Sequence, residues 1–207
     1  MYYGFADALK GNLDSGLFWL NLISNSFGSL LSIGMYVLAA LGLYTIARRR
    51  GINKAWLAWI PVINCWLVGC ISDQYRYVVK GEVKSKRKSL LVLTIIQVAL
   101  ILAFVGALIV TIVSGVNLAM FGGGYSYIMQ SILVPLIVTL GLLLPLFGVT
   151  IAKTIIYYMA MYDLYTSCAP ENNGLFLALS IIIKVTEPFF IFFNRNNDKG
   201  MPPRRVI

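Results

Sequence analysis

The sequence predicts an all-α integral membrane protein with three full spans and two proline-broken helical segments that are re-entrant or interfacial. The first observation behind this fold class is a run of 64 consecutive residues, Ser89 to Ala152, without Asp, Glu, Lys, Arg or His. The second is composition, since hydrophobic residues make up 59% of the chain and charged residues 12%. Soluble proteins contain roughly 45–50% and 25% of these classes, so the charge-free run belongs in a bilayer.

We expect a single membrane domain over residues 1–207, because no polar stretch is long enough to bury a core of its own. Its four parts, in order, are an outer amino-terminal segment; a span with a broken segment and a basic loop; a two-span hairpin; and an interfacial helix with a second broken segment and a basic tail. These parts cover residues 1–25, 26–88, 89–152 and 153–207.

Three segments are apolar and long enough to cross a bilayer, whose hydrocarbon core takes about 20 residues of helix. The charge-free run contains two of them, joined by an uncharged connection at Gly115–Tyr127. The other lies upstream and ends at the basic triplet Arg48–Arg50. Aromatic residues within Tyr157–Tyr165 then predict an interfacial helix after the last span. The expected spans are Phe27–Ala47, Leu90–Ser114 and Ser131–Ala152.

The distribution of charge predicts the orientation of these spans. Ten of the 17 basic residues fall between Arg48 and Lys88, and that window contains only two acidic residues, Asp73 and Glu82. Short cytoplasmic loops collect Lys and Arg, so we expect the amino terminus outside and the carboxyl terminus in the cytoplasm. The same rule accounts for the net charge of +9, and no nucleic-acid partner is expected.

Two further apolar segments are interrupted. Ala55–Ile71 contains Pro61 at its middle, and Leu175–Phe193 contains two charged residues and Pro188. A full crossing by either segment would place a neighbouring basic cluster outside, whereas a re-entrant or interfacial hairpin keeps the clusters in the cytoplasm. We therefore expect hairpins, with full crossing as the alternative.

The two broken segments contain the candidate residues of a polar intramembrane site, Asn64, Lys184 and Glu187. Lys184 and Glu187 are three residues apart, so on one helix they face the same way and can pair. Ionisable groups at membrane depth are costly and point to function. In the competing structural interpretation, the charged pair stabilises the tip of its hairpin, and Asn64 satisfies backbone groups that Pro61 leaves unpaired.

The basic clusters are the candidate contact for anionic lipid headgroups or for another membrane protein. No metal site or cofactor is expected, because the chain has no His and its three cysteines do not form a metal-binding pattern. No catalytic residue is assigned either, since the motifs of intramembrane proteases are missing from the sequence. The candidate contact residues are Arg48, Arg49, Arg50, Lys84, Lys86, Arg87 and Lys88.

Two runs of the sequence carry a resemblance to a known family. The first is IARRRGINKAWLAWIPVINCWLVGCISDQYRYVVKG, residues 46–81, and the second is MYDLYTSCAPENNGLFLALSIIIKVTEPFFIFFNRNNDKGMPPRR, residues 161–205. Both resemble a family of small uncharacterised polytopic membrane proteins of Gram-positive, clostridial-type gut bacteria. The resemblance implies a multi-pass protein of the bacterial cytoplasmic membrane, and it assigns no functional residue.

The function that these features favour is a non-enzymatic accessory or scaffold protein of the membrane, whose basic cytoplasmic face contacts anionic lipid or a partner protein. The alternative is a small transporter or channel with a polar site where the two broken helices meet. A third hypothesis is a lipid-processing membrane enzyme, because clustered cytoplasmic charges can hold a phospholipid headgroup.

Overall fold

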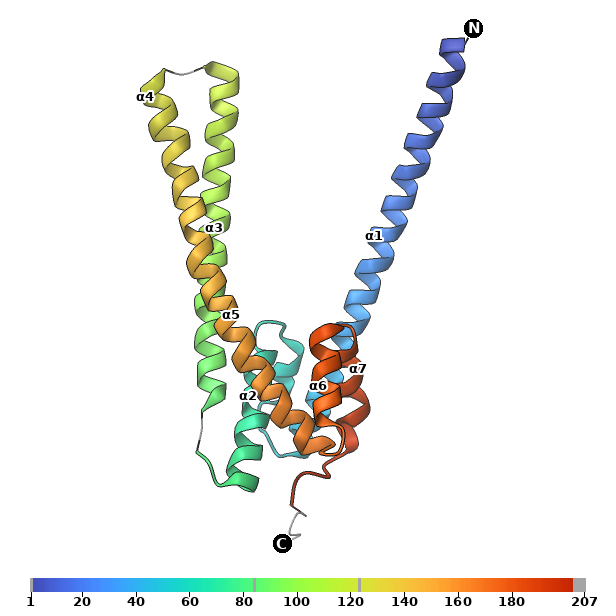
Figure 1. Cartoon of the computed structure of the whole chain (residues 1–207), viewed down its shortest axis with the longest axis vertical. Helices are drawn as coiled ribbons and strands as arrows, with labels where there is room; N and C mark the ends of the chain where they lie inside the picture. The colour runs from blue at the N-terminus through green and yellow to red at the C-terminus, as the bar shows by residue number, and fades with distance from the viewer. Residues whose placement is uncertain (1, 84, 123, 203–207) are drawn as a thin grey trace.

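The computed structural model describes residues 2–83, 85–122 and 124–202, and these residues form helices and connecting turns without any β-strand (Figure 1). The expected all-helical class is therefore confirmed. Three stretches of helix in the described part of the chain are long and apolar enough to cross a membrane, as the sequence predicts. These stretches are Ser26–Arg49, Lys86–Leu118 and Met129–Cys168.

The first of them belongs to α1 (Tyr2–Arg49), one continuous helix of 48 residues. The amino-terminal segment at residues 1–25, expected as a separate part, continues this helix over the residues that the structure describes. Helix α1 ends at Arg49, and the turn that follows contains Gly51, whose φ of 73° lies in the left-handed region that favours glycine. The backbone N–H of Gly51 donates to the carbonyl of Arg48 at 3.1 Å, which satisfies one of the carbonyls left free at the helix end.

The other two spans form an antiparallel pair. Helix α3 (Lys86–Phe121) leads through α4 (Tyr125–Ile128) and a π-helical turn at Met129–Leu133 into α5 (Val134–Cys168). Pro145 lies inside α5 without ending it.

The helix expected after Ala152 is present as the continuation of α5, which runs unbroken to Cys168. One of the aromatic residues expected at an interface does not lie on a surface. Tyr165 is fully buried, because the last part of α5 packs into the core rather than lying on a surface.

The first broken segment runs back alongside α1. It consists of a 3₁₀ helix (Ala55–Trp59), a turn, α2 (Asn64–Tyr75) and a π-helical turn (Arg76–Lys80). The hydroxyl of Tyr36 donates to the carbonyl of Trp59 at 2.6 Å, and the amide of Gln74 donates to the carbonyl of Arg50 at 3.1 Å. The chain therefore leaves the end of α1, reaches the level of Tyr36 and returns.

The second broken segment reverses in the same way. It contains α6 (Asn173–Ile182) and α7 (Thr186–Phe193), which lie beside each other, and a short 3₁₀ turn (Asn194–Asn196). The backbone N–H of Gly200 donates to the carbonyl of Ser167 at 3.1 Å, so the chain returns to the end of α5. At 1.5 Å per residue, α6 and α7 are about 15 and 12 Å long, about half the hydrocarbon thickness of a bilayer.

The helices form a V in Figure 1. Helix α1 diverges from the α3–α5 pair, and α2, α6 and α7 lie between the lower ends of the two arms. We call this lower end the basic end, because the end of α1, the start of α3 and the tail after α7 meet there. The start of α1 lies at the opposite end of the molecule from the tail after α7.

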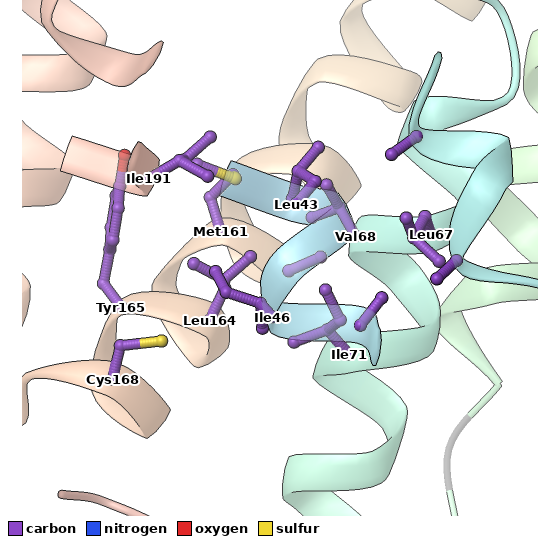
Figure 2. Packing of buried hydrophobic residues seen from close by; sticks show 14 of the residues in the cluster. Leu43, Ile46, Leu67, Val68, Ile71, Met161, Leu164, Tyr165, Cys168 and Ile191 are labelled. Carbon is purple, nitrogen blue, oxygen red and sulfur yellow. The ribbon is translucent and has the colours of Figure 1, made fainter. Parts of the chain in front are cut away.

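The hydrophobic core lies near the basic end and joins both arms of the V (Figure 2). Its members come from α1, the 3₁₀ helix at Ala55–Trp59, α2, α5 and α7, and Leu90 adds the first turns of α3. The labelled members in Figure 2 are Leu43, Ile46, Leu67, Val68, Ile71, Met161, Leu164, Tyr165, Cys168 and Ile191.

Two glycines allow the closest helix contacts in this core. A Cβ on Gly69 of α2 would lie 2.7 Å from Cα of Arg87 in α3. A Cβ on Gly42 of α1 would lie 3.0 Å from the backbone of Ile191 in α7. Both distances are shorter than a van der Waals contact, so the backbones come this close only because these residues lack a side chain.

Candidate functional site

A charged cluster centred on Asp163 joins three helices at the basic end. Oδ2 of Asp163 accepts hydrogen bonds from Ser72 Oγ at 2.6 Å, from Arg76 Nε at 2.7 Å and from Lys86 Nζ at 2.8 Å. Asp163 is 0% exposed and lies on α5, while the donors come from α2, the turn after α2 and the start of α3. We refer to these four residues as the Asp163 cluster.

The arrangement stabilises the charged form of Arg76. The hydrogen bond to Asp163 is the main cause that raises the pKa of the Arg76 guanidinium above its ordinary value. Nζ of Lys86 also donates to the carbonyl of Met159 at 3.0 Å. Oδ1 of Asp163 has no hydrogen-bond donor among the described residues, so all three donors converge on one oxygen. The cluster is a buried junction between helices rather than an open binding site.

A second carboxylate fixes the start of α3. Asp73 accepts hydrogen bonds from the backbone N–H groups of Lys86 at 2.8 Å and Arg87 at 3.2 Å. A carboxylate at a helix amino terminus satisfies free N–H groups and interacts favourably with the helix dipole. Asp73 thereby sets the position of α3 relative to α2.

A third carboxylate holds the tail against the end of α1. Asp198 forms ion pairs with Arg49 at 3.1 Å and with Arg50 at 3.2 Å. Arg50 also donates to Ser167 Oγ at 2.9 Å, and its side chain is almost completely buried. Arg50 and Asp198 therefore tie together α1, α5 and the tail.

These contacts divide the predicted basic contact residues into two groups. Arg50 and Lys86 are buried and engaged, so neither forms part of an exposed contact surface. Arg48, Arg87 and Lys88 are exposed, and Arg49, which pairs with Asp198, is partly exposed. Lys84 lies outside the described residues.

Two cavities open at the basic end. One has a volume of about 850 Å³ and is lined by the triplet Arg48–Arg50, by Gln74 and by Asp198, among others. The other, about 460 Å³, is lined in part by Lys54 and Arg87. Either volume is sufficient for a lipid headgroup. The larger cavity has three basic side chains and one acidic side chain, whereas the smaller has two of each.

A separate polar cavity of about 260 Å³ lies between α3, α5 and the turn between α6 and α7. We call it the Lys153 cavity. Nζ of Lys153 donates to Oε1 of Gln97 at 2.9 Å, and Nε2 of Gln97 donates to Thr150 Oγ1 at 3.2 Å. The hydroxyl of Tyr157 donates a short hydrogen bond to the carboxylate of Glu187. The lining residues are Cys65, Gln97, Thr150, Lys153, Thr154, Tyr157, Tyr158, Lys184 and Glu187.

The structure brings two of the three predicted intramembrane residues together. Lys184 and Glu187 both line the Lys153 cavity, whereas Asn64 does not, and its neighbour Cys65 takes that place. Lys184 and Glu187 do not form the predicted ion pair, because no contact within 4.0 Å joins their charged groups in the described part of the chain. Lys184 lies in the turn before α7 rather than on the same helix.

Gln97 and Lys153 were missed by the sequence interpretation. Gln97 is the one amide side chain in the expected second span, and Lys153 is the first charged residue after the charge-free run. A polar residue in each of two adjacent spans is the signal that could have indicated the contact between them.

In the part of the chain that the structure describes, no three His, Cys, Asp or Glu residues lie close enough to hold a metal ion. With three bilayer-length apolar helices and polar groups at their junctions, the fold has the features of a multi-pass membrane protein. No protein-family model, no curated protein and no solved structure matches the chain.

Proposed function

We propose that the protein is a non-enzymatic accessory or scaffold component of the membrane whose basic end binds the headgroups of anionic lipids. The basic end lies in the cytoplasm and the amino terminus outside, as the positive-inside rule requires. The resemblance of residues 46–81 and 161–205 to a clostridial-type family favours the bacterial cytoplasmic membrane.

In this proposal the two broken segments are re-entrant hairpins. Their tips lie beside Tyr36 of α1 and Tyr157 of α5, where they accept hydrogen bonds. Counted along the helices at 1.5 Å per residue, these tyrosines are about 20 Å from Arg49 and about 16 Å from Cys168. Each hairpin thus enters roughly half of a 30 Å hydrocarbon layer and returns to the basic end.

One observation carries the lipid-binding proposal, the imbalance of charge at the basic end. Four of its five acidic residues, Asp73, Glu82, Asp163 and Asp198, are held by basic residues or by a helix amino terminus. Several basic side chains have no carboxylate within ion-pair distance among the described residues. An anionic membrane surface attracts such unpaired positive charges by about 1 kcal/mol each. They include Arg48, Lys54, Lys80, Lys88, Arg195 and Lys199.

Tryptophan fluorescence can report which lipids surround the first hairpin, because Trp56 and Trp59 are exposed on it. We would reconstitute the protein with brominated phosphatidylglycerol or brominated phosphatidylcholine, each diluted in unbrominated lipid, and compare the quenching. The expected result is stronger quenching by the anionic lipid. Neutralising four exposed residues should remove the preference, in a variant that carries Arg48→Gln, Lys54→Gln, Lys80→Gln and Lys88→Gln.

The matched control exchanges Lys and Arg at the same four positions and keeps the charge. Lys86 is left unchanged because its loss would unfold the Asp163 cluster rather than test lipid contact. Equal quenching by the two lipids in the wild-type protein would exclude lipid selectivity and would favour a protein partner for the basic end.

The second candidate is a small transporter or channel. One observation favours it, since the α6–α7 turn and α2 both contribute to the Lys153 cavity through Lys184, Glu187 and Cys65. Broken helices that meet at membrane depth form the sites of several transporters. Proteoliposome currents that disappear in Glu187→Gln would support this candidate, and an absence of current from the wild-type protein under ion and proton gradients would remove it.

A further inference from the structure

The Lys153 cavity contains more positive than negative charge at a depth where charge is costly. Its charged side chains are Lys153, Lys184 and Glu187. Gln97 lies 11 residues beyond Lys86, which places the cavity about 16 Å along α3 from the basic end. A charged side chain inside a bilayer needs a partner or an aqueous cavity.

The glutamate does not neutralise Lys153. Glu187 accepts the hydrogen bond from Tyr157, and no carboxylate lies within 4.0 Å of Lys153 in the described ranges. Nζ of Lys153 has three N–H donors, and Oε1 of Gln97 accepts one of them at 2.9 Å. Two donors of an ammonium group are therefore available to a ligand, and a negatively charged acceptor forms the strongest bond with them.

The surfaces next to the cavity are apolar. Phe147 lies one turn from Thr150 on α5, and Ile101 lies one turn from Gln97 on α3, in both cases on the same helix face and on the side away from the basic end. Both side chains are exposed, as is Ile183 beside Lys184. In Figure 1 the two arms of the V separate above α6 and α7. Above that level, α1, α6 and α7 do not cover the α3–α5 pair.

From these observations we infer that the Lys153 cavity binds the anionic headgroup of an amphiphile, with Lys153 as the charge-pairing residue and the alkyl chain lying along α3 and α5. The cavity volume of about 260 Å³ suits a phosphate or carboxylate headgroup and leaves no room for a long chain. The ammonium group of Lys184 is the second cation near the ligand. This inference requires membrane insertion, but it does not depend on lipid binding at the basic end.

Cys65 provides a direct readout because it lines the cavity. We would alkylate the purified full-length chain in a nonionic detergent with N-ethylmaleimide and follow the adduct by intact mass. Three additives separate charge from chain: oleoyl lysophosphatidate, oleoyl lysophosphatidylcholine with the same chain and no net charge, and glycerol 3-phosphate with the anion and no chain. Of the three additives, only lysophosphatidate should slow the alkylation of Cys65. The adduct is assigned to Cys65 by its absence in the variant Cys65→Ser.

Two variants test the role of Lys153. Lys153→Gln should weaken protection by lysophosphatidate on the order of tenfold, as expected for the loss of a charged hydrogen bond, whereas Lys153→Arg should keep it. Lys88→Gln removes one positive charge at the basic end instead, and this variant should also keep the protection by lysophosphatidate. Native mass spectrometry of bound lysophosphatidate gives the same comparison without relying on thiol reactivity.

Two results would overturn the inference: equal protection by the two oleoyl lipids, or full retention of lysophosphatidate by Lys153→Gln. Protection of Cys65 by glycerol 3-phosphate as strong as that by lysophosphatidate would also contradict the inference, since the alkyl chain would then contribute nothing. The quenching experiment at the basic end reports a different surface, so failure of one proposal is distinguishable from failure of the other.

Discussion

Lys86 in the first turn of α3 donates from Nζ to Oδ2 of Asp163, 77 residues away on α5, at 2.8 Å. The same oxygen accepts hydrogen bonds from Ser72 and Arg76. The long, largely apolar helices α3 and α5 are therefore joined at the basic end by a buried ion cluster that also includes α2. Packing between apolar helices in lipid gains little from the hydrophobic effect, so polar junctions of this kind fix which helices meet and in which register.

Asp163→Asn is expected to destabilise the protein by about 3–5 kcal/mol, the range for removing one partner of a buried ion pair. The amide would leave Arg76 and Lys86 buried without a negative charge. Thermal unfolding of the purified protein in detergent would measure the loss. The matched control is Glu82→Gln, because Glu82 also pairs with Arg76 but is 44% exposed at its side chain. A change as small for Asp163→Asn as for Glu82→Gln would contradict the structural role of the cluster.

Gly69→Ala is expected to destabilise the contact between α2 and α3. The new Cβ would lie 2.7 Å from Cα of Arg87, so one of the helices must move. The control is Gly106→Ala on α3, whose Cβ would meet no atom within 4 Å. Alanine has a higher helix propensity than glycine, by about 1 kcal/mol, so the control variant should be unchanged or more stable. Equal unfolding temperatures for the two variants would argue against the close contact.

Much of this fold could be predicted from charge and apolar length alone. Ser89–Ala152 is long enough for two spans, and Pro61 and Pro188 mark segments in which the chain reverses. These features are local in the sequence. The helical pattern also continues in the sequence from Lys153 to Tyr165, as α5 does. The burial of Tyr165 could not be predicted, because it depends on packing against distant segments.

The Asp163 cluster and the Lys153 cavity could be predicted only in part. The partners of Asp163 lie 77 to 91 residues away, so no local pattern in the sequence indicates the cluster. Lys184 and Glu187 of the cavity are recognisable as charged residues in an apolar segment. The contact between Gln97 and Lys153 depends on the register of α3 against α5. Register is fixed by packing over the whole helix pair, and no short segment of the sequence contains that information.

One cysteine of three is expected to react with a maleimide at pH 7.5 in the folded protein. Cys65 is partly exposed, whereas Cys70 and Cys168 are buried. Burial raises the pKa of Cys70 to about 11, so its thiol stays protonated and unreactive as pH rises from 7 to 9. Intact-mass analysis should therefore show one adduct before denaturation and three in SDS. Two or more adducts formed rapidly without SDS would show that the packing around Cys70 or Cys168 is looser than described.

The last prediction tests the proposed orientation. In intact cells a membrane-impermeant thiol reagent should modify Tyr125→Cys and spare Ser85→Cys and Lys199→Cys, each in a chain whose native cysteines are replaced. All three positions are exposed in the structure, so access to the reagent depends on the side of the membrane and not on burial. After permeabilisation all three variants should react, which controls for intrinsic reactivity. Labelling of Ser85→Cys in intact cells would mean that the segment between α1 and α3 crosses the membrane, and labelling of Lys199→Cys would mean the same for the α6–α7 segment. Either result would exclude the corresponding re-entrant hairpin, since its two ends must lie on the same side of the membrane.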